Sequence, residues 1–235
     1  MVFLADRIAD NLRVVLGRMA EAARRGGRSA DDVRLVAVTK YVGPGEALAL
    51  VAAGCHDLGE SRPQQLWRKA AALKTAGVAW HLIGHLQRNK VARTLPLVSL
   101  VHSGDSLRLL EALDAEVACA KGDPLPVLLE VNVSGDAAKH GLAPGELEPL
   151  ADSLARLPRI EIQGLMAMAG REGNLDDARR EFAALRQLRD ELRAAWAGRW
   201  PLDELSMGMS GDYEVAIEEG ATLVRVGSAL FQGLE

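Results

Sequence analysis

The feature that most constrains the fold is an alternation of short apolar runs with longer helix-like segments. Eight runs have strand length, at residues 34–40, 56–59, 80–86, 97–101, 127–133, 160–168, 202–207 and 222–230. Segments of helical character lie between most of them, at residues 45–53, 63–76, 89–94, 106–121, 144–157, 175–197 and 211–219. Strands that alternate with helices favour a parallel sheet. Eight such units in 235 residues predict an α/β fold, a closed (β/α)8 TIM barrel.

An extra helix is expected ahead of the first unit. Its apolar positions recur at spacings of three and four residues, at Leu4, Ile8, Leu12, Val15 and Met19. This is the periodicity of an amphipathic helix, and it stops at the Gly26-Gly27 pair. No long linker, low-complexity tract or internal repeat follows. We therefore predict one domain over residues 1–235.

Composition excludes several classes of function. The 28 basic and 32 acidic residues give a net charge of −4, so we expect neither nucleic acid nor an anionic membrane as a partner. The sequence has no apolar stretch long enough to span a bilayer, and residues 1–7 do not resemble a secretory signal. Cys55 and Cys119 form no CxxC pair, and the histidines lack zinc-ligand spacing. We expect reduced thiols, no metal and a cytoplasmic protein.

The lysine that closes the first apolar run is a candidate for covalent chemistry. Lys40 follows a β-branched strand, and active sites of barrels lie at the C-terminal ends of the strands. We expect its amine to be partly desolvated there. Burial disfavours the ammonium form, and a neutral amine can attack an aldehyde to give a Schiff base. Position alone also fits a surface lysine that simply ends a strand.

Two segments near the C-terminus have the chemistry of a phosphate cradle. Residues 206–212 follow the seventh run and open onto a helix near Tyr213, where backbone N–H groups and the Ser210 hydroxyl can bind an anion. Residues 225–230 follow the eighth run and offer Gly227 and Ser228. Each segment alone also fits an ordinary turn. Together, after strands seven and eight, they occupy the usual phosphate site of this barrel class. A lysine across the mouth then suggests a phosphorylated aldehyde, and pyridoxal 5′-phosphate (PLP) is the common one.

These residues match a known family. The sequence resembles the YggS/PROSC family of PLP-binding proteins, also called PLP homeostasis proteins, from about Val33 to Gly233. The most specific matches are WHLIGHLQRNK at residues 80–90 and LSMGMSGD at residues 205–212. The other matching stretches are residues 35–40, 58–60, 131–134 with Lys139 and Gly141, 164–168 and 224–233. The resemblance implies a barrel similar to the N-terminal domain of bacterial alanine racemase.

The resemblance also implies roles for individual residues. Lys40 would hold PLP as a Schiff base, and Arg225 would face the pyridine nitrogen. The other implied contacts are the phosphate ligands Ser210, Gly227 and Ser228, and the ring-pocket residues Asn132 and Met207. The family usually has asparagine at the position of Ser61, which puts a pocket role for that position in doubt.

Two kinds of function stay open. A racemase needs an acid/base on each face of the substrate carbon, and the resemblance to alanine racemase implies that the second one comes from another domain. We expect no such domain, because the sequence ends at Glu235 directly after the eighth unit. Tyr41 should point away from Lys40, and Tyr213 should pack in a helix. His85 and His102 are expected to be hydrogen-bonded structural residues.

We therefore expect a PLP carrier involved in vitamin B6 homeostasis, without robust catalysis and without a dedicated catalytic residue. It would hand PLP to apo-enzymes through transient contacts, with Lys139 as a candidate acceptor during release, and it would act as a monomer. An arginine cannot accept the ring proton, so Arg225 should weaken the electron sink of PLP. The alternatives are a PLP-dependent amino-acid racemase or lyase, and a Schiff-base aldolase without PLP.

Overall fold

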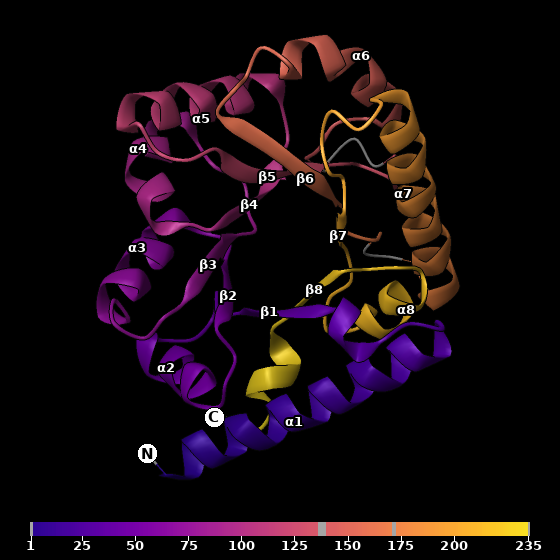
Figure 1. Ribbon diagram of the computed structural model, residues 1–235. Helices are drawn as coiled ribbons and strands as arrows, with labels where there is room; N and C mark the ends of the chain where they lie inside the picture. The colour runs from indigo at the N-terminus through magenta and orange to yellow at the C-terminus, as the bar shows by residue number, and fades with distance from the viewer. Residues whose placement is uncertain (1, 136–139, 171–172, 235) are drawn as a thin grey trace.

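The predicted barrel is present in the structure. A computed structural model describes residues 2–135, 140–170 and 173–234, and within them eight parallel strands close into one barrel in chain order (Figure 1). The strands are β1 Arg34–Val38, β2 Asp57–Glu60, β3 Ala79–Leu82, β4 Leu100–Gly104, β5 Leu125–Glu130, β6 Ile160–Met166, β7 Glu204–Ser206 and β8 Leu223–Val226. β1 pairs with β8, with Val36 beside Arg225, and this pairing closes the sheet.

Helices surround the strands. They are α1 Val2–Arg25, α2 Pro44–Ala52, α3 Pro63–Ala72, α4 Val91–Thr94, α5 Leu107–Ala120, α6 Pro144–Leu154, α7 Leu175–Ala195 and α8 Tyr213–Glu218. Short 3-10 turns lie at Ala30–Asp32, Arg88–Lys90, Leu95–Leu97 and Ser228–Phe231. No helix of the described residues is long and apolar enough to cross a membrane.

The extra N-terminal helix covers the seam between the last and the first unit. α1 lies along α8, α2 and the Ser228–Phe231 turn (Figure 1). Ile8, Leu12, Val15 and Met19 are buried in this contact, as their spacing predicted. Arg25 at its end pairs with Glu214 and Glu218 of α8. In the described part of the chain β8 is followed by the Ser228–Phe231 turn, and α1 is the helix that covers this side of the barrel.

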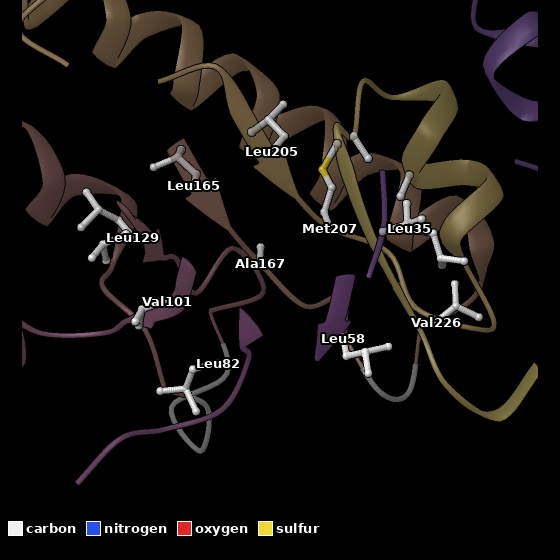
Figure 2. Packing of buried hydrophobic residues seen from close by; sticks show 14 of the residues in the cluster. Leu35, Leu58, Leu82, Val101, Leu129, Leu165, Ala167, Leu205, Met207 and Val226 are labelled. Atoms are coloured by element: carbon white, nitrogen blue, oxygen red, sulfur yellow. The ribbon is translucent and has the colours of Figure 1, made fainter. Parts of the chain in front are cut away.

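The apolar core has two layers, because successive side chains of a strand point to opposite faces of the sheet. The outer layer, between strands and helices, includes Leu35, Leu58 and Leu205 (Figure 2). A smaller cluster fills the inside of the barrel, with Val36, Leu100, Leu128, Met166 and Leu223. Polar side chains share the inside of the barrel with this cluster, and they build the site described below.

Several predicted boundaries were wrong. The fourth strand begins at Leu100 rather than residue 97, because Pro96 starts a 3-10 turn over Leu95–Leu97. The helix predicted at residues 89–94 is one short turn, α4, between two 3-10 turns. The eighth strand ends at Val226, and Ser228–Phe231 is a 3-10 turn. Continuous apolar runs overshoot strand ends, since apolarity alone does not distinguish a strand from the buried turn after it.

Candidate functional site

Lys40 lies at the C-terminal mouth of the barrel, two residues beyond β1. Its side chain is exposed rather than partly desolvated, which corrects the sequence-based expectation. Tyr41 does not point away from it either, because the Lys40 Nζ lies 4.9 Å from the centroid of the Tyr41 ring. This cation–π contact exists because the chain turns directly after Thr39 instead of continuing as a strand. The amine is therefore accessible to a ligand at the mouth.

A buried ion pair fixes the backbone just before Lys40. Lys69 of α3 is 1% exposed; its Nζ donates to the Thr39 carbonyl oxygen at 2.5 Å and forms a short contact with the Glu60 carboxylate. The Thr39 hydroxyl donates to the same Glu60 oxygen at 3.0 Å. Glu60 and Thr39 are both fully buried. The β1 end that presents Lys40 is thus tied to α3 and to the end of β2.

Arg225 of β8 points into the barrel. Its side chain is 4% exposed; Nη1 donates to the Ser206 hydroxyl oxygen at 2.5 Å and Nη2 to the Ala167 carbonyl at 2.9 Å. Burial lowers the pKa of Arg225 to about 10, and the nearby carboxyls of Glu130 and Asp212 partly counter this effect. The guanidinium is therefore still charged at neutral pH. It is held rigidly on the strand next to the one that presents Lys40.

A chain of hydrogen bonds runs from Arg225 through the barrel. Ser206 bonds His102 Nδ1 at 2.9 Å, His102 Nε2 bonds His81 Nδ1 at 2.9 Å, and His81 Nε2 bonds Asp57 Oδ1 at 2.9 Å. Burial lowers the pKa of His102 well below its ordinary value. These distances allow an arrangement in which each group donates to the next, from Arg225 to the Asp57 carboxylate. The hydrogen bond from His81 lowers the pKa of Asp57.

The two predicted phosphate segments meet at the mouth. The backbone N–H of Gly227 donates to the Ser210 Oγ at 3.1 Å, which joins the loop after β7 to the loop after β8. The hydrogen of the Ser210 hydroxyl stays available to another acceptor. Within the described part of the chain, the N–H groups of Ser210, Gly211 and Ser228 have no hydrogen-bond partner. These donors lie beside β1, because Gly227 approaches Val38 closely.

The start of α8 does not present its amides as the sequence suggested. The Met209 N–H donates to the Asp212 carboxylate at 2.5 Å, and the N–H groups of Asp212 and Tyr213 both donate to the Met209 carbonyl. Those three donors are therefore satisfied inside the loop. The Asp212 side chain closes the loop on itself, and this leaves Ser210, Gly211 and Ser228 as the unbonded amides described above.

Gly208 is required by this loop. Its φ is +91°, and a Cβ there would lie 2.5 Å from the Ala216 Cβ. We expect Gly208→Ala to lower the free energy of unfolding by about 2 kcal/mol or more, from the left-handed backbone and the clash together. Gly211→Ala in the same loop is the matched control, because nothing lies within 4 Å of its Cβ position. Urea unfolding of both variants tests this, and equal losses would contradict it.

The two predicted ring-pocket residues are placed differently. Asn132, just after β5, is half-buried, and its Oδ1 accepts a hydrogen bond from the Ser134 hydroxyl at 3.0 Å. Met207 is fully buried in the outer layer, among Leu35, Leu205 and Val226 (Figure 2). Successive residues of an extended chain point to opposite faces of the sheet. Met207 directly follows Ser206, so its side chain faces away from Ser206 and Arg225. This position does not support the predicted contact of Met207 with a ring at the mouth.

Sequence reasoning missed Glu130, which closes β5 and is 5% exposed. The pKa of Glu130 is raised to about 7, mainly by burial and then by the nearby Asp105 carboxylate, while Arg225 and His85 partly oppose this rise. A carboxylate at the end of an apolar strand run could have pointed to it. Glu60 closes β2 in the same way. Lys69 gave no comparable signal, because a lysine on an amphipathic helix is ordinarily exposed. His102 is the buried, hydrogen-bonded residue that was predicted. Lys139 lies outside the described residues.

The Glu130 carboxyl should make stability depend on pH. The folded chain holds its proton up to about pH 7, whereas an unperturbed glutamate releases it near 4.5. The unfolded state thus binds fewer protons between these values, so the free energy of unfolding should fall as pH rises through this window. At 1.36 kcal/mol per pKa unit the loss reaches about 3 kcal/mol. Urea unfolding at pH 5 and pH 8 should show a smaller fall for Glu130→Gln than for the wild type. The same fall in both would contradict the assignment.

Comparison with known proteins gives a consistent result. The family model described as alanine racemase, N-terminal domain, matches residues 6–235. A pyridoxal phosphate homeostasis protein of Pseudomonas aeruginosa is 41% identical over 224 residues, which is 95% of this chain and 94% of that protein. One of Aquifex aeolicus is 39% identical over 222 residues, covering 94% and 96% of the two chains. The solved structure of PipY from Synechococcus elongatus with PLP bound is 31% identical, with a TM-score of 0.85 over 95% of this chain and 99% of that one.

Proposed function

We propose that this chain, which belongs to the family of pyridoxal phosphate homeostasis proteins, binds PLP at the C-terminal mouth of its barrel and takes part in PLP homeostasis. The observation that carries the proposal is the placement of three kinds of group on the neighbouring strands β8 and β1 and the loop after β7. These are the accessible Lys40 amine, the amides around Ser210 and Ser228, and the buried Arg225 guanidinium.

The residues at the mouth fit the chemical groups of PLP. Its phosphate needs several donors, and the unbonded amides of Ser210, Gly211 and Ser228 together with the Ser210 hydroxyl supply them. Its aldehyde needs an amine, and the Lys40 Nζ is exposed there. When bound, PLP supplies an electrophilic carbonyl and an electron-accepting ring. We propose that Lys40 holds it as a Schiff base, with loss of the aldehyde oxygen as water.

Arg225 orients the ring in this proposal. A guanidinium has no acceptor site, so it can only donate a hydrogen bond to the pyridine nitrogen. Its links to Ser206 and Ala167 leave it no freedom to turn away. The chain of hydrogen bonds to Asp57 keeps Ser206 oriented to accept from Arg225. We propose that Arg225 holds the nitrogen unprotonated and so limits carbanion chemistry at the site.

We propose that the chain is a carrier rather than a robust catalyst. A racemase needs a second acid/base opposite Lys40. Tyr213 is 4% exposed and packs within α8 and its surroundings, and burial raises its pKa, so it is poorly suited to exchange protons at the mouth. Alanine incubated in deuterated water with the PLP-loaded chain tests this. We expect no deuterium at the α-carbon above the level given by free PLP, and faster incorporation would favour a racemase or lyase.

The assembly is also a proposal. We infer that residues 1–235 act as a single domain and a monomer, and that the chain contacts apo-enzymes transiently in the cytoplasm. Cys55 and Cys119 form no disulfide in the described structure. Sedimentation of the PLP-loaded chain, alone and with an apo-form of a PLP-dependent enzyme, tests both statements. A stable dimer, or a tight complex that persists after PLP transfer, would contradict them.

A further inference from the structure

Three side chains that the proposed PLP site does not use converge at the same mouth of the barrel. His85 follows β3, Asp105 follows β4, and His140 lies in the segment between β5 and α6. One potential ligand atom from each lies within 4.8 Å of the others. His85 Nδ1 bonds Asp105 Oδ2 at 2.6 Å, and the rings of His85 and His140 stack with centroids 4.8 Å apart and planes 14° from parallel.

Hydrogen bonds fix the Asp105 side chain and the backbone that follows His140. The Ser106 hydroxyl donates to Asp105 Oδ1 at 3.0 Å, which leaves Oδ2 directed toward His85. The Asp105 carboxylate is only 6% exposed, whereas His85 is 46% exposed. His140 precedes Gly141 and Leu142, and Leu142 pairs with the end of β5 through its bond to the Glu130 carbonyl at 2.8 Å. Gly141 has a φ of +112° and lies too close to the β5 backbone for a side chain.

We propose that His85, Asp105 and His140 form a binding site for a divalent transition-metal ion, with Zn²⁺ as the best match. Two imidazoles and one carboxylate are ligands that Zn²⁺ prefers. Ligand atoms about 2.0 to 2.1 Å from a tetrahedral ion lie about 3.4 Å apart. Binding would therefore lengthen the 2.6 Å contact between His85 and Asp105 and turn the exposed His140 ring out of its stack on His85, so that the three ligand atoms face one point. The Ser106–Asp105 bond is the outer-shell contact that orients such a carboxylate.

The site would connect three parts of the chain that are far apart in sequence. The ion would link the segment leading to α6 with the ends of β3 and β4, on the rim of the mouth that contains Lys40. Its remaining coordination positions would face solvent, because His85 and His140 are both exposed. Zinc-ligand spacing in the sequence could not show the site, because each ligand comes from a different βα unit.

Calorimetric titration of the full-length chain, freed of PLP and of metal, with Zn²⁺ tests the proposal. We expect one ion per chain in the wild type. Loss of an outer-shell partner typically weakens a metal site 10- to 100-fold. Loss of a direct ligand should cost at least as much, so His140→Ala should weaken Zn²⁺ binding by at least about tenfold. Binding of Co²⁺ should give visible ligand-field bands that disappear in Asp105→Asn. Since His140 is exposed, its replacement leaves the barrel folded.

Matched controls separate this site from other zinc-binding groups. His56 and Cys119 are both exposed and lie away from the mouth. His56→Ala and Cys119→Ser should bind Zn²⁺ as the wild type does. No binding to the wild type would overturn the proposal, as would an affinity that His140→Ala and Asp105→Asn leave unchanged. These outcomes do not depend on PLP binding, because the titration uses the PLP-free chain.

Discussion

Replacing Lys69 by methionine is expected to lower the free energy of unfolding by about 3 to 5 kcal/mol, the usual effect of removing one partner from a buried ion pair. Lys69 is 1% exposed and Glu60 is fully buried. One oxygen of Glu60 already has no hydrogen-bond partner among the described residues. Without Lys69 the other oxygen keeps only the Thr39 hydroxyl. A carboxylate in that position must then take up a proton or open the structure to water.

Urea unfolding followed by circular dichroism measures this loss. Lys74→Met is the matched control, because Lys74 is exposed just after α3 and its replacement should change stability by less than about 0.5 kcal/mol. Lys69→Met combined with Glu60→Leu should recover part of the loss, since it removes both charges. If Lys69→Met is no less stable than Lys74→Met, the buried pair does not support the end of β1.

Replacing Lys40 is expected to abolish retention of PLP rather than to weaken it slightly. The phosphate donors and Arg225 can still bind the ligand reversibly, but neither can form a covalent bond to its aldehyde. After gel filtration, Lys40→Ala should therefore carry only background PLP, and the band near ~420 nm that PLP shows as a protonated Schiff base should be lost. Lys40→Arg is the sharper variant, because it keeps a cation beside Tyr41 without a nucleophilic amine.

Lys74→Ala provides the corresponding control, because it removes an exposed lysine away from the mouth. It should retain PLP and the absorbance band like the wild type. Retention by Lys40→Arg would show that the cation, not the amine, is what the ligand requires. The absence of any band in the wild type would instead favour a Schiff-base aldolase that works without PLP.

The local spacing of apolar residues was sufficient to predict most of the architecture. The alternation of apolar runs with helical segments predicted the barrel, and the spacing from Ile8 to Met19 predicted α1. The position of Lys40 after the first run placed it at the mouth, because strand ends of a parallel barrel share one side. Each of these inferences depends on neighbours within a few residues. Their success follows from the regular periodicity of helices and strands.

The remaining features depend on contacts between distant segments. Lys69 is buried only because Thr39 and Glu60 meet it from β1 and β2. His81 and His102 become one hydrogen-bonded chain because β3 and β4 are adjacent in the barrel. The Asp212 carboxylate accepts the hydrogen bond of the Met209 N–H, an amide that the sequence suggested was free to bind phosphate. This bond forms because the chain turns at Met209. The Ser206 hydroxyl faces Arg225 inside the barrel, so the next residue, Met207, points outward.

Borohydride reduction of the PLP-loaded chain, followed by peptide mass mapping, tests the central claim most directly. Reduction fixes PLP to whichever amine holds it as a Schiff base. We predict one labelled peptide, with the added mass on Lys40, and no label on the exposed Lys74 or Lys121. A label at another lysine, or a label spread over exposed lysines and unchanged in Lys40→Ala, would contradict the claim that Lys40 holds the cofactor.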